Sequence, residues 1–207
     1  MPRRLRFRGE IAGAGSTSGV RVVVGRWVET PLGAFADAMV ETAAGHRVLL
    51  APHQDAADFI ASTYTFDEVR VAPFTATVTT LAGAGTTWQV RSADLELDLT
   101  LGARTPLGSA LRLVPRTLAT SPAWCTVTDP VARLALRGVR TRGSAGGGRR
   151  EYYAATDRRA VTGLTGSFDG VPLGALAPVD PPCRFGFSST PRRPGVTAVV
   201  TTVTVPD

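Results

Sequence analysis

Residues 93–101 alternate regularly between apolar and polar side chains, and this pattern constrains the fold more than any other stretch of the chain. The apolar and polar positions of the pattern are Leu95, Leu97, Leu99, Leu101 and Asp94, Glu96, Asp98, Thr100. Successive side chains of a β-strand point to opposite faces, so the leucines would enter a core and the acidic stripe would face solvent. A helix would scatter the acids around its axis. We therefore predict a strand with one buried face.

Similar short β patterns recur between turn residues along the rest of the chain. They predict further strands over residues 5–11, 20–24, 34–41, 47–51, 69–80, 151–155, 160–168, 183–188 and 196–205. Pro73 would bend one of these strands, and Asp169-Gly170 would form a tight hairpin turn. Helices are expected over 53–64, 107–114 and 130–137. The last of these would begin with Asp129 as its N-cap and Pro130 at its first position.

This succession of elements predicts the fold class. We expect one domain over residues 1–207, mainly β (α+β), built as a closed or partly closed antiparallel barrel or cone with two or three short peripheral helices. Strands do not alternate regularly with helices and no G-x-G-x-x-G sequence follows a strand, which disfavours a Rossmann-type sheet. No change in composition divides the chain.

The composition excludes several kinds of chemistry. All 23 basic residues are arginine, so a Schiff-base lysine and a phosphate-binding loop lysine are impossible, and we expect no cofactor. Cys125 and Cys183 lack metal or redox spacing and are interpreted as buried thiols in a reducing compartment. The basic start of the chain lacks the apolar segment of a secretory signal, and its apolar runs are too short to cross a bilayer. We therefore expect a cytoplasmic protein without a membrane partner.

Basic charge is concentrated in the second half of the chain. Residues 104–207 contain 14 arginines and six acids, and eight of these arginines lie between Arg133 and Arg159 around a glycine-rich loop. Guanidinium groups recognise carboxylates and phosphates through paired hydrogen bonds, so the cluster indicates an anionic ligand. The candidate ligand-binding residues are Arg133, Arg137, Arg140, Trp27, Trp124 and Tyr152, the aromatic side chains forming the wall of the site. Two alternatives remain: ordinary solvated arginines, or nucleic-acid binding, which is disfavoured because no nucleic-acid-binding motif accompanies the charge.

Few side chains can carry protons near neutral pH. The chain has two histidines, and His46 is the candidate for catalysis, with a solvated surface histidine as the alternative. No group of histidines, cysteines and carboxylates has the spacing of a metal site, so we expect no metal. The G-x-S-x-G sequence of serine hydrolases is absent.

One stretch resembles a known family. Residues 26–40, Arg-Trp-Val-Glu-Thr-Pro-Leu-Gly-Ala-Phe-Ala-Asp-Ala-Met-Val, are similar to an early segment of acetoacetate decarboxylase-like proteins, in which an aromatic residue precedes a Ser-Pro-x-Gly-Pro-Tyr sequence and then an acidic residue on a strand. The resemblance implies a closed antiparallel β-cone around an apolar cavity. Decarboxylating members use a Schiff-base lysine, which this chain lacks, so that activity would be lost or replaced.

These observations lead to a ranked set of functions. The first is the binding of a small organic anion in the cavity or mouth of a β-barrel. The second is a decarboxylase-like enzyme that uses His46 or a carboxylate in place of lysine. The third is a basic interaction module for nucleic acid or an acidic partner. The oligomeric state stays open.

Overall fold

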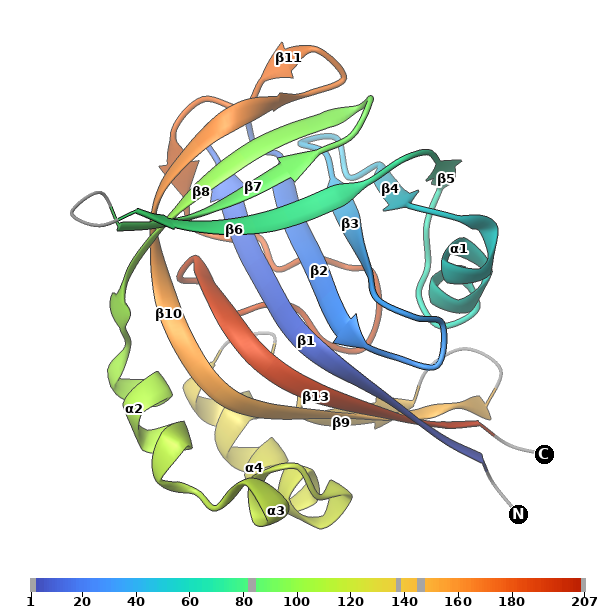
Figure 1. Ribbon diagram of the computed structural model, residues 1–207, viewed down its shortest axis with the longest axis vertical. Coiled ribbons are helices and arrows are strands. Elements are labelled where there is room, and N and C mark those ends of the chain that lie inside the picture. Colours follow the sequence, from blue (N-terminus) through green and yellow to red (C-terminus); the bar gives the residue numbers. More distant parts are fainter. Residues whose placement is uncertain (1–2, 82–84, 137–138, 145–147, 206–207) are drawn as a thin grey trace.

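One large curled sheet organises the molecule. The computed structural model describes residues 3–81, 85–136, 139–144 and 148–205. Ten strands follow one another across the sheet in the order β5-β4-β3-β2-β1-β13-β10-β8-β7-β6 (Figure 1). Their bounds are β1 Arg3–Ser16, β2 Arg21–Glu29, β3 Phe35–Glu41, β4 Arg47–Ala51, β5 Glu68–Val71, β6 Thr75–Leu81, β7 Gly85–Arg91, β8 Leu95–Arg104, β10 Arg150–Phe168 and β13 Gly195–Val205. Three short strands add to its sides: β9 Arg142–Ser144, β11 Val171–Pro172 and β12 Leu176–Ala177.

The sheet forms an open half-barrel. A mainly β fold is therefore confirmed, but the barrel is not closed: within the described residues β5 and β6 end the strand order without pairing to each other. The sheet is also mixed, because β5 runs parallel to β4. Parallel neighbours need a crossover connection, and helix α1 (Gln54–Ala61) supplies it. Pro73 then separates β5 from β6, so the strand predicted over 69–80 is two strands.

The described part of the chain contains four helices, where two or three were expected. Besides α1 they are α2 Pro106–Leu113, α3 Arg116–Ala119 and α4 Pro122–Ala135. The helix predicted from residue 130 begins eight residues earlier, because the Ser121 hydroxyl accepts from the Trp124 N–H and caps it. Pro130 lies inside α4, and the Asp129 carboxylate accepts from the backbone N–H groups of Thr141 and Arg142 instead of capping a helix.

Two other predictions fail at the level of single elements. The strands expected over 151–155 and 160–168 are one strand, β10, which pairs with β13 along its first half and with β8 along its second. Residues 183–188, expected to be a strand, are irregular. The leucine pattern of β8 is confirmed: all four leucines are buried, and the intervening side chains are more exposed.

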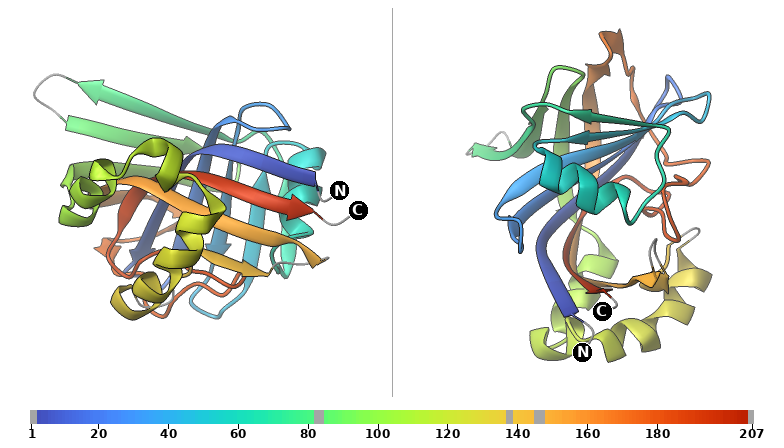
Figure 2. Two further views of the ribbon diagram at one scale, coloured as in Figure 1. Left: turned by 90° about the horizontal axis from the view of Figure 1, so that it is seen from below. Right: turned by 90° about the vertical axis from the view of Figure 1, so that its right-hand side faces the viewer.

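The central parts of β1–β3 are buried on both faces. Even-numbered side chains such as Val22, Val24 and Val40 pack with Trp88 of β7 and Leu97 of β8 in the main core. Odd-numbered side chains point the other way, since alternate residues face opposite sides of a strand. In the right-hand view of Figure 2, β6 and β7 lie on one side of β1–β3 and the irregular segment 178–194 lies on the other. The space inside the curl is thus filled, and any hollow must lie on the second face.

Candidate ligand-binding cavity

A cavity of about 510 Å³ lies on this second face. Its floor consists of odd-numbered residues of β1, β2, β3 and β13 together with residues of β10. Its other walls come from α1, α2, α4 and the irregular residues 183–191. Small-molecule sites in proteins commonly have volumes of this size. The cavity is therefore large enough for a small organic ligand.

Most of the cavity wall is apolar and aromatic. The aromatic side chains that line it are Phe7, Trp27, Phe35, Phe59, Tyr64, Trp124, Tyr153 and Phe185. Phe7 holds part of this wall together, because its ring stacks on Phe59 at a centroid distance of 4.9 Å and meets Trp27 edge-on at 6.0 Å. The Arg149 guanidinium lies over the outer side of this group, 5.0 Å from the Phe59 ring centre. An apolar ligand body would be well accommodated here.

A buried carboxyl group interrupts the apolar wall at Asp37. One of its oxygens, Oδ1, accepts a hydrogen bond from Trp27 Nε1 at 2.8 Å, and the residue is 2% exposed. Gly25 makes this contact possible, because a Cβ there would lie 2.5 Å from both bonded atoms. Burial raises the pKa of Asp37 to about 7, against the opposing effect of the Trp27 hydrogen bond. No arginine or histidine in the described part of the chain forms an ion pair with Asp37.

A second buried carboxyl group lies at Glu151. The hydroxyls of Tyr64 and Tyr153 donate to its Oε2 at 2.8 and 2.9 Å, and the two hydroxyls also contact each other. Tyr64 follows α1 whereas Tyr153 belongs to β10, so this cluster joins opposite walls of the cavity. Burial raises the pKa of Glu151, although both tyrosine hydrogen bonds oppose the shift. Burial also raises the pKa values of both tyrosines well above 10.0, so the hydroxyls stay protonated.

A buried guanidinium group lies on β10 at Arg158. Arg158 is 5% exposed and donates to Thr197 Oγ1 at 2.9 Å and to the Arg193 carbonyl. It lies against Gly195, where a Cβ would be 2.8 Å from its Nη2. Burial lowers the pKa of Arg158, but a guanidinium remains charged at neutral pH. Within the described residues no carboxylate forms an ion pair with it.

Two buried threonine hydroxyls in the cavity wall have no hydrogen-bond partner among the described residues. They belong to Thr190 and Thr201. Thr190 packs over Gly13, which pairs in register with Gly195, the residue beneath Arg158. Neighbouring strands are roughly 5 Å apart. The Thr190 hydroxyl and the Arg158 guanidinium are therefore held over adjacent positions of the floor.

The structure brings only some of the sequence-predicted ligand residues to the cavity. Trp27, Trp124 and Arg140 line it, but Arg140 already pairs with Asp129 at 3.2 Å. Arg133 is exposed on α4 and does not contribute to the lining. The side chain of Tyr152 packs with Cys125, Ala154 and Val200 and does not line the cavity. Arg137 lies outside the described residues.

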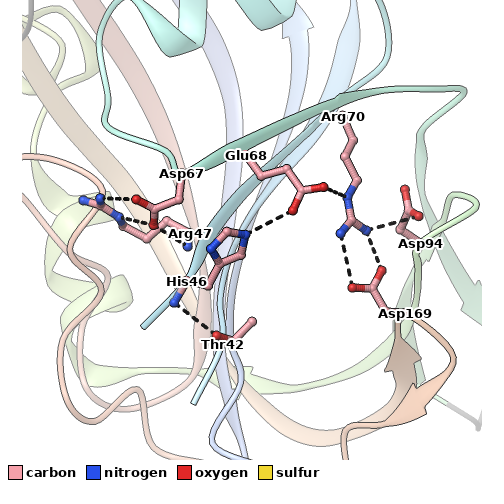
Figure 3. Close-up of polar contacts among 8 residues, drawn as sticks. All are labelled: Thr42, His46, Arg47, Asp67, Glu68, Arg70, Asp94 and Asp169. Atoms are coloured by element: carbon pink, nitrogen blue, oxygen red, sulfur yellow. Dashed lines mark hydrogen bonds and ion pairs between the residues drawn. The ribbon is translucent and has the colours of Figure 1, made fainter. Parts of the chain in front are cut away.

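The catalytic candidate His46 lies away from the cavity. Its Nε2 is 3.0 Å from Glu68 Oε2 in an exposed network (Figure 3). In the same network Arg70 contacts Glu68, Asp94 and Asp169, and so links β5 to two turns. These contacts connect surface strands and offer no enclosed space for a substrate.

The three buried charged residues that distinguish the cavity, Asp37, Glu151 and Arg158, were not predicted from the sequence. For Asp37 a signal exists, because the acid stands between apolar residues in Phe-Ala-Asp-Ala-Met-Val. Strands that are apolar on both faces are buried on both faces, so a single acid among them is also buried. Glu151 and Arg158 follow the arginine-rich loop in the sequence. Nothing in the local sequence distinguishes them from the solvated charged residues around them.

The described residues offer neither a metal site nor a reactive thiol. No group of three or more histidines, cysteines or carboxylates could hold a metal ion there. Cys125 and Cys183 are buried free thiols, and burial raises the pKa of each to about 11. No helix in the described ranges is both long and apolar enough to span a bilayer.

Comparison with known proteins adds no relative: no family model, curated protein or solved structure matches this chain. The resemblance over residues 26–40 is therefore untested. These residues do contribute Trp27, Phe35, Asp37 and Met39 to the cavity wall.

Proposed function

We propose that this protein binds a small amphipathic organic acid in the cavity of its second face. The acid group pairs with Arg158. The apolar body of the ligand packs on the aromatic wall formed by residues such as Trp27 and Phe7. The function is thus that of a carrier or sensor for a carboxylate-bearing small molecule.

The observation that carries this proposal is the buried Arg158 guanidinium without an acidic partner. A buried charge is costly unless it is paired, because the apolar interior cannot replace its hydration. Two of its donors are used by Thr197 and the Arg193 carbonyl. A ligand carboxylate at the cavity end of the guanidinium would supply the missing negative charge through charge-assisted hydrogen bonds.

The binding position differs from the one expected at Arg133, Arg137 and Arg140. Of these, Arg140 is neutralised by Asp129, and Arg133 is solvated on α4. Arg158 belongs to the same basic half of the chain but is distinguished by burial. A buried guanidinium without an acidic partner in an apolar cavity supports anion binding more strongly than a cluster of arginines on the surface.

The proposal is tested by calorimetry with decanoate and with decanol, which has the same chain but no charge. We expect decanoate to bind and to lose about thirtyfold in affinity in Arg158→Gln, since a buried charge partner is removed. Arg133→Gln removes an exposed arginine and should leave the affinity unchanged. If Arg158→Gln does not fold, Val199→Phe is the second variant: it fills the cavity from β13 and should abolish decanoate binding. Equal binding of decanoate and decanol, or equal affinity in Arg158→Gln, would overturn the proposal.

A further inference from the structure

Two opposite charges lie at the two ends of one row of residues across the cavity floor. The row runs through the paired residues Asp37, Gly25, Ile11, Thr197 and Arg158, which belong to five neighbouring strands. All five line the cavity. Four strand spacings separate the ends by roughly 19 Å along the curved sheet. The floor is therefore a strip with a carboxyl group at one end, a guanidinium at the other, and small or apolar residues between them.

The carboxyl end of this row has the composition of an ammonium site. The Asp37 carboxylate accepts one hydrogen bond from Trp27, and its second oxygen has no hydrogen-bond partner among the described residues. Trp27 bonds directly to it, and Phe35 lies on the same face of β3, two residues away. Aromatic faces attract cations through their ring quadrupoles, most strongly where water is excluded. A buried carboxylate beside aromatic rings is thus complementary to an organic cation.

The hydrogen bond between Asp37 and Trp27 requires a residue without a side chain at position 25. Gly25 leaves the floor without a side chain directly beside Asp37, and a Cβ would displace both partners of the hydrogen bond. The carboxylate is thereby held toward the cavity by its bond to the indole. Asp37 belongs to the cavity lining, so an ammonium group with three donors could approach its carboxylate from the cavity.

We propose that the ligand carries an amino group at the end opposite its acid group, and that Asp37 binds this ammonium. The ligand class is therefore an amino acid with widely separated charges, such as an ω-aminoalkanoate, with an apolar middle that crosses Ile11. This inference rests on the proposed binding of an acid at Arg158 and names the second half of the same ligand.

The test compares ω-aminoalkanoates of increasing chain length with plain alkanoates of the same length, by calorimetry on the intact protein. At one optimal length, we expect the amino group to raise affinity about tenfold, because a charge-assisted hydrogen bond and an aromatic contact are gained. Asp37→Asn should remove this gain, so that the ω-aminoalkanoate and the plain alkanoate of the same length bind this variant equally. Asp58→Asn, which removes an exposed acid from α1, should keep the gain.

The possible outcomes separate the two proposals. If alkanoates bind through Arg158 but the amino group adds no affinity at any chain length, the ammonium site is overturned and the acid site stands. A gain that survives in Asp37→Asn would also overturn the ammonium site. If decylamine binds through Asp37 but alkanoates do not bind, the ammonium site stands and the acid site fails. If Asp37→Asn does not fold, Phe35→Leu provides the second variant and should reduce the gain through the lost aromatic face.

Discussion

At the scale of single residues, the cavity depends on charged groups that the fold buries without neutralising. Asp37, Glu151 and Arg158 are each at most 5% exposed. Elsewhere the protein pairs its buried charges: Glu41 contacts Arg21 at 2.9 Å and Arg184 at 3.1 Å. The cavity residues are thus exceptions in a chain that otherwise satisfies its buried acids, as expected where a ligand completes the interactions.

The first prediction concerns the pH dependence of stability. The pKa of Asp37 is 3.8 in its ordinary environment and about 7 in the folded protein, so the folded state holds this proton more tightly. The free energy of unfolding should therefore fall as pH rises between these values, by up to about 4 kcal/mol. Asp37→Asn cannot titrate and should show a shallower decline. Urea unfolding of both proteins across this pH range measures the difference.

The comparison isolates Asp37 from the groups around it. Trp27 does not titrate, and Tyr64 stays protonated throughout because its pKa is raised well above 10.0. Glu151 contributes a decline of the same sign in both proteins, since burial raises its pKa too. Identical slopes for the wild type and Asp37→Asn would contradict the prediction.

The second prediction concerns the hydroxyl of Thr201, which is buried without a hydrogen-bond partner among the described residues. Thr201→Val keeps the shape but removes the unsatisfied oxygen, so we expect the ligand-free protein to gain about 1 kcal/mol in unfolding free energy. Thr197→Val is the matched control and should lose stability, because Thr197 Oγ1 accepts from Arg158. Chemical denaturation measures both. A loss of stability in Thr201→Val would show that its hydroxyl is satisfied.

At the scale of elements, the alternation of apolar and polar residues predicted where strands occur. It predicted the ends of the strands and the starts of the helices less well. Strand β8 was predicted because its leucines form one clear buried set of alternate side chains. The start of α4 was missed because Asp129-Pro130 imitates a helix start, while the buried acid serves Arg140 and the backbone after the helix. The sequence predicted two strands in place of the long β10 because the residues in its middle are polar. The middle is held in the sheet by pairing with β13 and β8, which are distant in sequence.

The same limit applies to the candidate site. Trp27 and Trp124 were predicted as wall residues from their chemistry alone, and both line the cavity. The pairing of Arg140 with Asp129, and the isolation of Arg158, depend on which carboxylates the fold brings near each arginine. That information comes from the sheet register and is absent from local sequence.

The third prediction tests where α4 begins. Ser121→Ala removes the hydroxyl that accepts from the Trp124 N–H at 3.1 Å, and should cost about 1 kcal/mol of unfolding free energy. Thr117→Ala, an exposed change on the neighbouring α3, should be close to neutral. Thermal or chemical unfolding of the two variants is sufficient. Equal stability of Ser121→Ala and the wild type would contradict a helix start at Pro122.

At the scale of the whole molecule, β1–β3 form a shared wall between a filled core and a hollow. Val24 is fully buried in the core, whereas its neighbour Val23 lines the cavity. The curl of the sheet brings β7 and β8 against one face only. The cavity on the other face is walled by helices α1, α2 and α4 and an irregular segment, which fill space less completely than a second layer of strands.

The fourth prediction uses these two neighbouring valines. Val24→Ala should lower the unfolding free energy by about 2 kcal/mol and leave decanoate affinity within about twofold of the wild type. Val23→Ala should cost less stability but weaken decanoate binding about fivefold, because part of the contact surface of the ligand is lost. Denaturation and calorimetry on the same preparations measure both quantities. Equal effects of the two substitutions on binding would contradict the division between the faces.

This shared wall also has an evolutionary consequence. In each of the three strands, one set of alternate side chains packs in the core and stabilises the fold, and the other set shapes the cavity. Under the proposed function, a descendant of this chain could change its ligand by substitutions at odd-numbered positions alone, while selection for stability keeps the even-numbered positions fixed.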